Sequence, residues 1–403
     1  MSLFNNRSLQ FLFFAQLFDE VQDKTSKVEA IVTDFEANEI VTPADCKRIS
    51  QEVNVVFHVL ATIKFNEPLQ DAVRINMVNT QKIVKMCHDI EALKSFIHVS
   101  TMFSNSNRDQ EINEEIYDHP LDYKQLLAIG GLQSKISVKS QPVGLNLQHD
   151  FPNTYTLTKH FAEKLVVDQA KNLPFGIFRP PIVISSYKNV PGWVDNINTL
   201  AALAVGFTKG HGRVALVRPD NPLHACPVDY CMNAIIAAAW DVSQKFRKDD
   251  QLSIPIYNYA SGTNNKTYGE AFSLFKRGFH EPLTGASKYY FVLKTTDRFS
   301  YAAINAALAM FPARVMDTIA AIQGMKGKNY KNAKIFKGVT DGYAFFMTTP
   351  FRFNSKNVPA LVGRVEQTER HKSSFEFDVR KVDWNRFYYN YIPGLRKFVF
   401  KGK

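Results

Sequence analysis

Short apolar runs alternate with segments of helical periodicity through the first two thirds of the chain, and this alternation most restricts the possible folds. The run VNVVFHVLA at 53–61 is almost continuously apolar, as in parallel strands buried on both faces. Further runs at 27–35, 95–99 and 175–183 predict strands, and apolar spacing at 69–90 and 154–170 predicts helices. The pattern is typical of an α/β fold with a doubly wound parallel sheet and helices on both faces.

From about residue 270 the pattern changes to helices rich in aromatic and basic residues, ending in DWNRFYYNYIPGLRKFVFKGK. We therefore predict an α/β domain over 1–270 and a mostly helical domain over 271–403.

The composition excludes a disordered chain, because 45% of the residues are hydrophobic and 13% are aromatic. Lys plus Arg number 49 against 38 Asp plus Glu, for a formal net charge of +11. The basic residues are interleaved with acids and form no nucleic-acid-binding motif, so we predict no nucleic-acid partner. A cationic surface also suits phosphate-bearing small molecules or an anionic membrane face.

The four cysteines form no C-x-x-C pair, so we predict neither a disulfide framework nor a metal site. The first 24 residues do not read as a signal peptide, because Asn, Arg, Gln and Asp interrupt their apolar positions. The nearest candidate for a membrane segment is Phe299 to Ile322, which contains Asn305, Arg314 and Asp317. We predict an amphipathic core helix pair broken near Pro312, with contact to a membrane surface as the alternative.

The sharpest local signal is Tyr155-x-x-x-Lys159 in a predicted helix. The four-residue spacing puts both side chains on one helix face, where an ammonium group lowers the pKa of a neighbouring phenol. The motif alone is weak, but it follows a strand that ends in Ser100-Thr101. Ligands of open α/β sheets bind beyond the carboxyl ends of strands, so these hydroxyls and Tyr155 can meet one carbonyl oxygen.

A strand ending in Arg179-Pro180-Pro181 comes next, where a rigid backbone can flank a nicotinamide ring. A strand-end hydroxyl, then Tyr-x-x-x-Lys, then a proline-bearing strand end is the order of the short-chain dehydrogenase/reductases. Several longer blocks, in order, resemble the fatty acyl-CoA reductases of the extended short-chain class, especially those of insects: VFHVLATIKFNEPLQDAVRINMVNTQKIV (56–84), FIHVSTMFSN (96–105), NTYTLTKHFAEKLV (153–166), IFRPPIV (177–183), PGWVDNIN (191–198), ACPVDYCMNAIIAAAW (225–240) and IYNYASGTNNKTYGE (256–270). The stretch from FRFNSKNVPAL to GLRKF (351–398) resembles the helical male-sterility-type C-terminal domain of that family.

The resemblance implies an alcohol-forming enzyme that reduces long-chain fatty acyl-CoA with NADPH, through an aldehyde that the enzyme retains. It implies Tyr155 as proton donor, Lys159 as the residue that orients the cofactor ribose, and Thr101 with Ser100 at the carbonyl oxygen. It also implies work at a membrane face, in the peroxisome or endoplasmic reticulum, and leaves the oligomeric state open.

The resemblance further implies cofactor contacts from two other places in the chain. Ala61-Thr62 matches a turn beside the cofactor, and Asp34 matches an acidic residue that contacts adenine. Pro180 and Pro181 stand near the nicotinamide, with Pro181 where the family more often has Ser.

The glycine-rich turn of a dinucleotide-binding fold has no counterpart before the 27–35 run, because the first glycine of the chain is Gly130. We predict a Rossmann-like sheet without its first βαβ portion, an uncovered edge on strand 53–61, and weak NADPH binding. Two explanations stay open, an incomplete sequence of a normal enzyme and a divergent protein that has lost cofactor binding.

The alternative function is a non-catalytic relative that binds acyl-CoA or lipid. A sugar-nucleotide epimerase or hydroxysteroid dehydrogenase is a weaker possibility, because those enzymes lack the C-terminal block. His58 and His98, inside predicted strands, are interpreted as core residues, because no second metal ligand stands at a suitable spacing.

Overall fold

The fold is seen in a computed structural model that describes residues 28–37, 39–130, 151–247, 254–262, 264–279, 291–368 and 375–400. Four strands form its central parallel sheet, in the order β1 (Val55–His58), β2 (Ser95–Val99), β3 (Phe175–Arg179) and β7 (Ile256–Asn258). Three of the predicted strand runs are therefore confirmed in their central parts, and the parallel sheet is confirmed with them.

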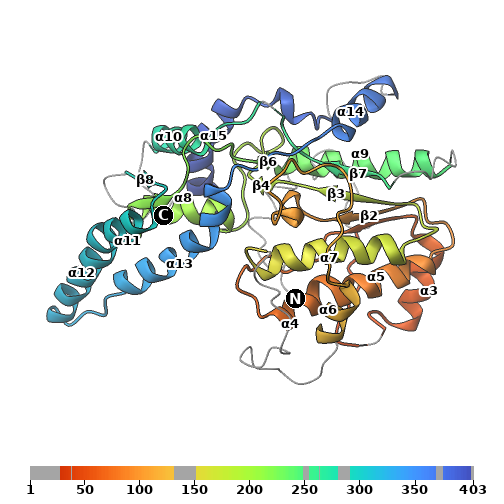
Figure 1. Ribbon diagram of the computed structural model, residues 1–403, viewed down its shortest axis with the longest axis horizontal. Coiled ribbons are helices and arrows are strands. Elements are labelled where there is room, and N and C mark those ends of the chain that lie inside the picture. Colours follow the sequence, from red (N-terminus) through yellow and green to blue (C-terminus); the bar gives the residue numbers. More distant parts are fainter. Residues whose placement is uncertain are drawn as a thin grey trace.

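Helices cover both faces of this sheet (Figure 1). One face carries α3 (Pro43–Glu52), α6 (Tyr123–Gly130), α7 (Thr154–Gln169) and a continuous helix of α4 (Leu69–Val73), the π-helical turn η2 (Arg74–Val78) and α5 (Asn79–His88). The other face carries α9 (Val228–Arg247). Neighbouring residues of β2 show the two layers, since Phe96 packs in the core under α7 and Ile97 in the core under α9.

The predicted run at 175–183 divides at its two prolines. Pro180 and Pro181 have no backbone N–H to donate to a ladder, so β3 ends at Arg179. The chain then forms β4 (Ile182–Ile184), which pairs in parallel with β6 (Ala225–Pro227) in a separate two-stranded sheet.

The predicted strand at 27–35 is wrong for the part that is described, residues 28–35. These residues form no strand, and Val28 and Val32 are 67% and 87% exposed. Among the described residues β1 lies at the edge of the sheet, as predicted, with Val55 and Phe57 exposed. An apolar run becomes a buried strand only beside a paired neighbour, and within the described ranges this segment has none.

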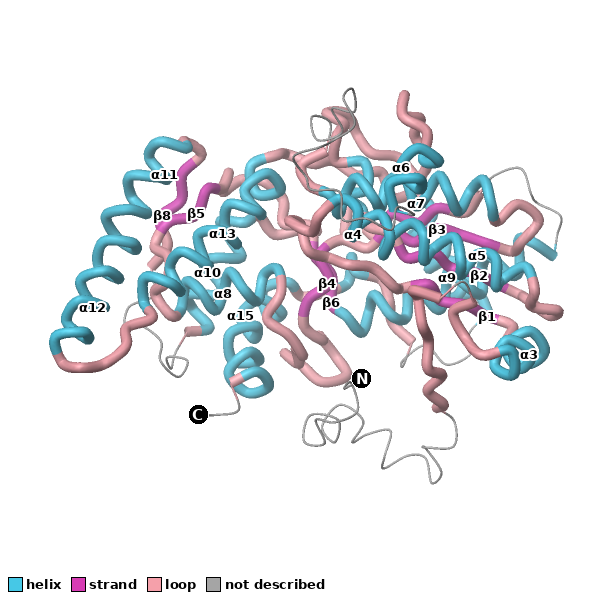
Figure 2. Tube along the Cα trace, turned by 90° about the horizontal axis from the view of Figure 1, so that it is seen from below, coloured by secondary structure: helices cyan, strands magenta, loops and turns pink. Residues whose placement is uncertain are grey.

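The later part of the chain is mainly helical, as predicted. From about residue 270 its helices are α10 (Tyr268–Gly278), α11 (Arg298–Asn305), the π-helical turn η4 (Ala306–Met310), α12 (Phe311–Ile322), α13 (Asn329–Thr348), α14 (Asn357–Thr368), α15 (Trp384–Gly394) and η6 (Leu395–Val399), and α8 (Thr199–Thr208) precedes them in the chain. Two short strands, β5 (Val214–Leu216) and β8 (Leu293–Thr295), pair beside them, and short 3-10 turns stand at η3 (Met102–Asn105) and η5 (Val379–Lys381). Figure 2 shows this helical part beside the sheet.

One hydrophobic core joins the two parts. It includes Phe178 and Tyr257 of the sheet together with Trp384 and Tyr388 of α15. The boundary near residue 270 therefore separates two patterns of sequence that share a core, and a separate domain over 271–403 stays a prediction.

The predicted break near Pro312 is wrong, because α11, η4 and α12 follow one another directly. Pro312 stands in the first turn of α12, immediately after the π-helical turn, where a missing backbone N–H disturbs the helix least. None of the helices in the described ranges combines the length and apolar character needed to span a bilayer.

Candidate active site

An apolar cavity of about 370 Å³ opens where the strands of the main sheet end. The segments that follow the strands line it with Val59 and Ala61 after β1, Ser100 and Thr101 after β2, and Pro180 and Pro181 after β3, and α7 adds Tyr155 and Lys159. Seven of the predicted site residues therefore meet at one cavity, as the rule for open α/β sheets leads one to expect.

The start of α7 places Tyr155 and Lys159 at this cavity. The Asn153 side chain accepts a hydrogen bond from Thr156 N at 2.9 Å and caps the helix, so Tyr155 falls in the first turn. Lys159 follows one turn later and is only 2% exposed. Its Nζ donates to the backbone oxygen of Val99 at 2.7 Å, which fixes the ammonium group at the end of β2.

Tyr155 and Thr101 line the same cavity, and the Thr101 hydroxyl is close enough to affect the pKa of the phenol. Burial raises the pKa of Tyr155 to about 12, and the Thr101 hydroxyl opposes this shift. Tyr155 is therefore a neutral phenol at physiological pH and holds a proton to donate. Thr101 and Tyr155 together present two hydroxyls on one wall of the cavity.

The expected lowering of the Tyr155 pKa by Lys159 is not found. The ammonium is held by the Val99 oxygen, and burial outweighs the other influences on the phenol. Burial also lowers the pKa of Lys159 to about 8, against the opposing charge of Glu163. The charge on this buried lysine is therefore sensitive to mildly alkaline pH.

Glu163, one further turn along α7, forms a buried ion pair that sequence reasoning missed. Its carboxylate accepts from Arg179 Nη2 at 2.6 Å and from Ser100 Oγ at 2.5 Å. Arg179 is fully buried, and its other N–H groups reach the backbone oxygens of Asn113 and Glu115 at 3.0 and 2.8 Å. Burial alone would raise the pKa of Glu163, but Arg179 and the serine hydroxyls hold it below its usual value.

This ion pair changes the interpretation of Ser100. Its hydroxyl donates to Glu163, so Ser100 connects the end of β2 to the ion pair, while the Thr101 hydroxyl lies near Tyr155. The sequence signal was an acidic residue four positions after Lys159 and an arginine directly before Pro180.

The predicted cofactor residues do not all lie at the cavity. Ala61 lines the cavity, whereas Thr62 does not and is held beside it. Buried Asn76 of η2 accepts from Thr62 N at 2.8 Å and donates to Thr158 Oγ1 at 2.9 Å, which ties the segment after β1 to α7. Asp34 is exposed and borders a different surface hollow, so it is not brought to the cavity.

The remaining walls of the cavity are apolar and come largely from the later part of the chain. They include Leu200 and Leu203 of α8, Met232 and Ile235 of α9, and Tyr343, Phe346 and Met347 of α13. Phe65 joins the two parts, because its ring stacks on Tyr155 at 6.0 Å between centroids and meets Tyr343 at 5.1 Å. The contribution of α13 was also missed, because aromatic spacing in a helix does not show which surface it will face.

His58 and His98 are buried core residues, as predicted. Their Nδ1 atoms lie 2.9 Å apart, and burial lowers the pKa of His58 to about 3.

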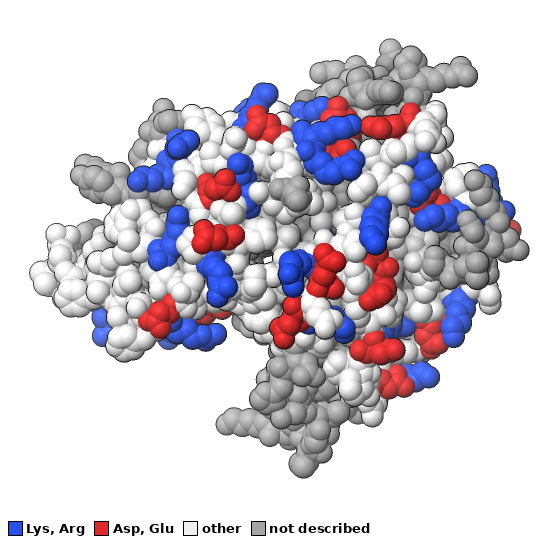
Figure 3. All heavy atoms as spheres, turned by 45° about the horizontal axis from the view of Figure 1, so that its top comes forward, with Lys and Arg blue, Asp and Glu red and all other residues white. Residues whose placement is uncertain are grey.

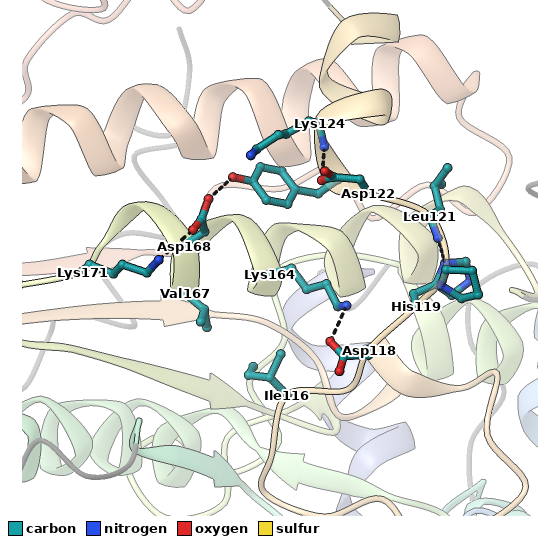
Figure 4. A pocket seen from close by; sticks show the side chains of 12 residues that line it. Ile116, Asp118, His119, Leu121, Asp122, Lys124, Lys164, Val167, Asp168 and Lys171 are labelled. Atoms are coloured by element: carbon teal, nitrogen blue, oxygen red, sulfur yellow. Dashed lines mark hydrogen bonds and ion pairs between the residues drawn. The ribbon is translucent and has the colours of Figure 1, made fainter.

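A second hollow lies on the outer surface of α7 (Figure 4). It is lined by charged groups that pair with one another, such as Lys164 with Asp118 at 3.2 Å and Tyr123 with Asp168 at 2.5 Å. Because these partners satisfy each other, the hollow adds no group to the site at the strand ends.

Comparison with known proteins agrees with this geometry. An NAD-binding family model described as "Male sterility protein" matches residues 4–235, and a second model of the same description matches 308–402. The chain is 32% identical to "Fatty acyl-CoA reductase wat" of Drosophila melanogaster over 88% of this chain and 67% of that protein. The chain belongs to the fatty acyl-CoA reductase family.

Other members of this family show similar agreement. "Fatty acyl-CoA reductase 1" of Xenopus laevis is 32% identical over 96% of this chain and 74% of its own length. "Fatty acyl-CoA reductase 2" of Homo sapiens is 27% identical over 96% of this chain and 75% of its own length.

The family's fold recurs in solved structures. The terminal R domain of the myxalamid PKS-NRPS pathway matches with a TM-score of 0.56 and 17% identity, over 92% of this chain and 74% of that one. A thiolation-reductase di-domain from an archaeal non-ribosomal peptide synthetase matches with a TM-score of 0.52 and 13% identity, over 97% of this chain and 67% of that one. At these identities the likeness concerns the fold alone.

Proposed function

We propose that this protein reduces long-chain fatty acyl-CoA to the primary alcohol with NADPH, through an aldehyde that stays in the site. The observation that carries the proposal is the pair of neighbouring hydroxyls, Tyr155 and Thr101, on the wall of a cavity whose other walls are apolar. A pair of hydroxyls suits a carbonyl oxygen, and the apolar walls from α8, α9 and α13 suit an acyl chain.

The strand ends fit the reactive end of a nicotinamide cofactor. Ala61, Pro180 and Pro181 line the cavity next to Lys159, and Thr62 is locked beside them. NADPH, when bound, supplies the hydride for each of the two reductions. We propose that Asp34 serves the adenine end, and a comparison of NADPH with NADH as reductant tests the choice of cofactor.

Each reduction also needs a proton at the carbonyl oxygen. Tyr155 is protonated at neutral pH and stands beside Thr101, so we assign Tyr155 as the proton donor and Thr101 as the second hydrogen-bond donor to that oxygen. We propose that Lys159, whose ammonium group donates to the Val99 oxygen at the end of β2, orients the cofactor ribose.

The test measures NADPH oxidation and alcohol formation with palmitoyl-CoA or stearoyl-CoA. We expect Tyr155→Phe to lower turnover by about 10²-fold or more while acyl-CoA binding stays unchanged. Tyr187→Phe is the matched control, because its hydroxyl accepts from Asp383 N at 3.2 Å and it does not line the cavity. Acyl-CoA binding without turnover, with Tyr155→Phe having no effect, would support the non-catalytic alternative.

We further propose that the reaction takes place at the peroxisomal or endoplasmic reticulum membrane, which the family resemblance supports. Microscopy of the tagged protein against markers of the two organelles distinguishes these compartments from each other and from a diffuse distribution.

A further inference from the structure

A helical arm projects from the end of the molecule farthest from α3. It comprises α11, η4, α12 and the first half of α13, residues 298–337, and two views show it standing away from the sheet (Figures 1 and 2). We call these residues the arm.

On an ordinary surface helix the large apolar side chains face the protein, whereas along α11, η4 and α12 many of them face outward. Along α11, η4 and α12 the buried residues recur every four positions and two of them are small: Tyr301, Asn305, Ala309 and Ala313. The outward stripe recurs at three or four positions and is large and apolar: Leu308, Phe311, Val315, Ile319 and Ile322. Phe311 is 68% exposed and Ile322 81%, so the stripe contacts little of the described chain.

The arm carries further exposed apolar side chains on α11, on α12, in the loop that follows α12 and on α13. They are Phe299 at 82%, Met316 and Met325 at 57% each, and Ile335 at 57%. Single exposed apolar residues are normal on any protein, but such a number in one projecting part of the chain marks an interaction surface. The predicted core helix pair therefore buries only one of its faces.

The charges around the stripe indicate which partner it fits. Between residues 298 and 340 the basic residues are Arg298, Arg314, Lys326, Lys328, Lys331, Lys334 and Lys337, and the single acidic residue is Asp317. Asp317 accepts from the backbone N–H groups of Asn329 and Tyr330 at 2.9 Å each, so it caps α13. Lys337 pairs with Asp341 just beyond this range, at 2.5 Å, and the other six basic residues give the arm a positive charge beside its apolar stripe.

An anionic phospholipid surface matches both properties, with negative headgroups for the lysines and acyl chains for the stripe. A second copy of the chain is a poorer match, because pairing two arms would bring like charges together. Figure 3 shows charged side chains of both signs over the middle of the molecule, whereas its left end is largely without them.

We propose that the arm docks on the surface of an anionic phospholipid bilayer, with α12 lying along the interface. The same helix α13 that carries Ile335 in the arm supplies Tyr343, Phe346 and Met347 to the cavity wall. Docking would hold the open cavity close to the lipid, which is where long acyl chains partition. This last link rests on the proposed function, whereas the docking itself does not.

The experiment is flotation of the full chain with vesicles of phosphatidylcholine alone or of phosphatidylcholine with phosphatidylserine. We expect the protein to float with the anionic vesicles, less with the neutral ones, and less as salt rises. Phe311→Asp with Ile319→Asp should lower the bound fraction about tenfold or more, because two large apolar groups no longer enter the interface. Ile236→Asp with Phe246→Asp, exposed apolar positions on α9, is the matched control and should float like the wild type.

A triple Lys326→Gln, Lys328→Gln, Lys331→Gln variant should lose only the preference for anionic vesicles. Circular dichroism checks that each variant is folded, and light scattering measures its oligomeric state. The proposal is overturned if the wild type stays unbound to both vesicles, or if the Phe311/Ile319 variant floats as well as the wild type. A dimer that this variant dissociates, without vesicle binding, would assign the face to self-association. Flotation needs neither NADPH nor turnover, so its result does not depend on whether the protein has the proposed reductase activity.

Discussion

Replacing Glu163 by glutamine tests the buried network beneath the candidate site. Arg179 is 0% exposed, and Glu163 supplies it with two charge-assisted hydrogen bonds, at 3.0 and 2.6 Å. Removing one partner of such a pair costs about 3–5 kcal/mol, because the remaining charge is buried without compensation. Glutamine keeps one acceptor oxygen, so we expect a loss of about 3 kcal/mol in the free energy of unfolding.

Equilibrium urea unfolding followed by tryptophan fluorescence measures this loss. Glu366→Gln is the matched control, because Glu366 pairs with Lys381 at 3.0 Å on the surface, where both side chains are more than half exposed. Exposed pairs contribute about 1 kcal/mol or less. Arg179→Met combined with Glu163→Gln should cost less than the sum of the single variants, because neither charge is then left alone. A Glu163→Gln protein within about 1 kcal/mol of the wild type would refute the reasoning.

The remaining predictions concern pH, packing and chain length. Burial lowers the pKa of Lys159 to about 8, and only the protonated side chain is positive. We therefore expect kcat/KM to fall as pH rises through about 8. A kcat/KM that stays constant well above about pH 8 would count against a role for the charge of Lys159. Gly206→Ala should destabilise the protein by about 1–3 kcal/mol in urea unfolding, because the added Cβ would overlap the Phe336 ring, whereas Gly338→Ala, with nothing within 4 Å, should be neutral or stabilising. Leu203→Trp should reduce the cavity and shift turnover toward shorter acyl chains, and an unchanged chain-length profile would remove this wall from the acyl site.

The positions of the central strands could be predicted from local pattern. Nearly continuous apolar runs mark strands buried on two faces, and β1, β2 and β3 lie inside three of these runs. Tyr155 and Lys159 were found because a four-residue spacing on a helix is a local property. Thr101 and the prolines were found because parallel strands end at one edge of the sheet.

The exposed segment at 28–35 shows where the same reasoning fails. Its apolar residues match a strand as well as those of β2 do, yet pairing requires a neighbour that the pattern of one segment cannot reveal.

The α/β pattern, the family resemblance and the Tyr-Lys pair could therefore be predicted, because each depends on residues close together in the chain. The buried pair of Glu163 and Arg179, the wall that α13 adds to the cavity and the outward apolar stripe of α12 are visible only in the folded chain. These features depend on which helix faces are buried, and burial is set by contacts between segments far apart in sequence. The pKa of Tyr155 follows the same rule, because burial raises it while the Lys159 ammonium is held at the Val99 oxygen.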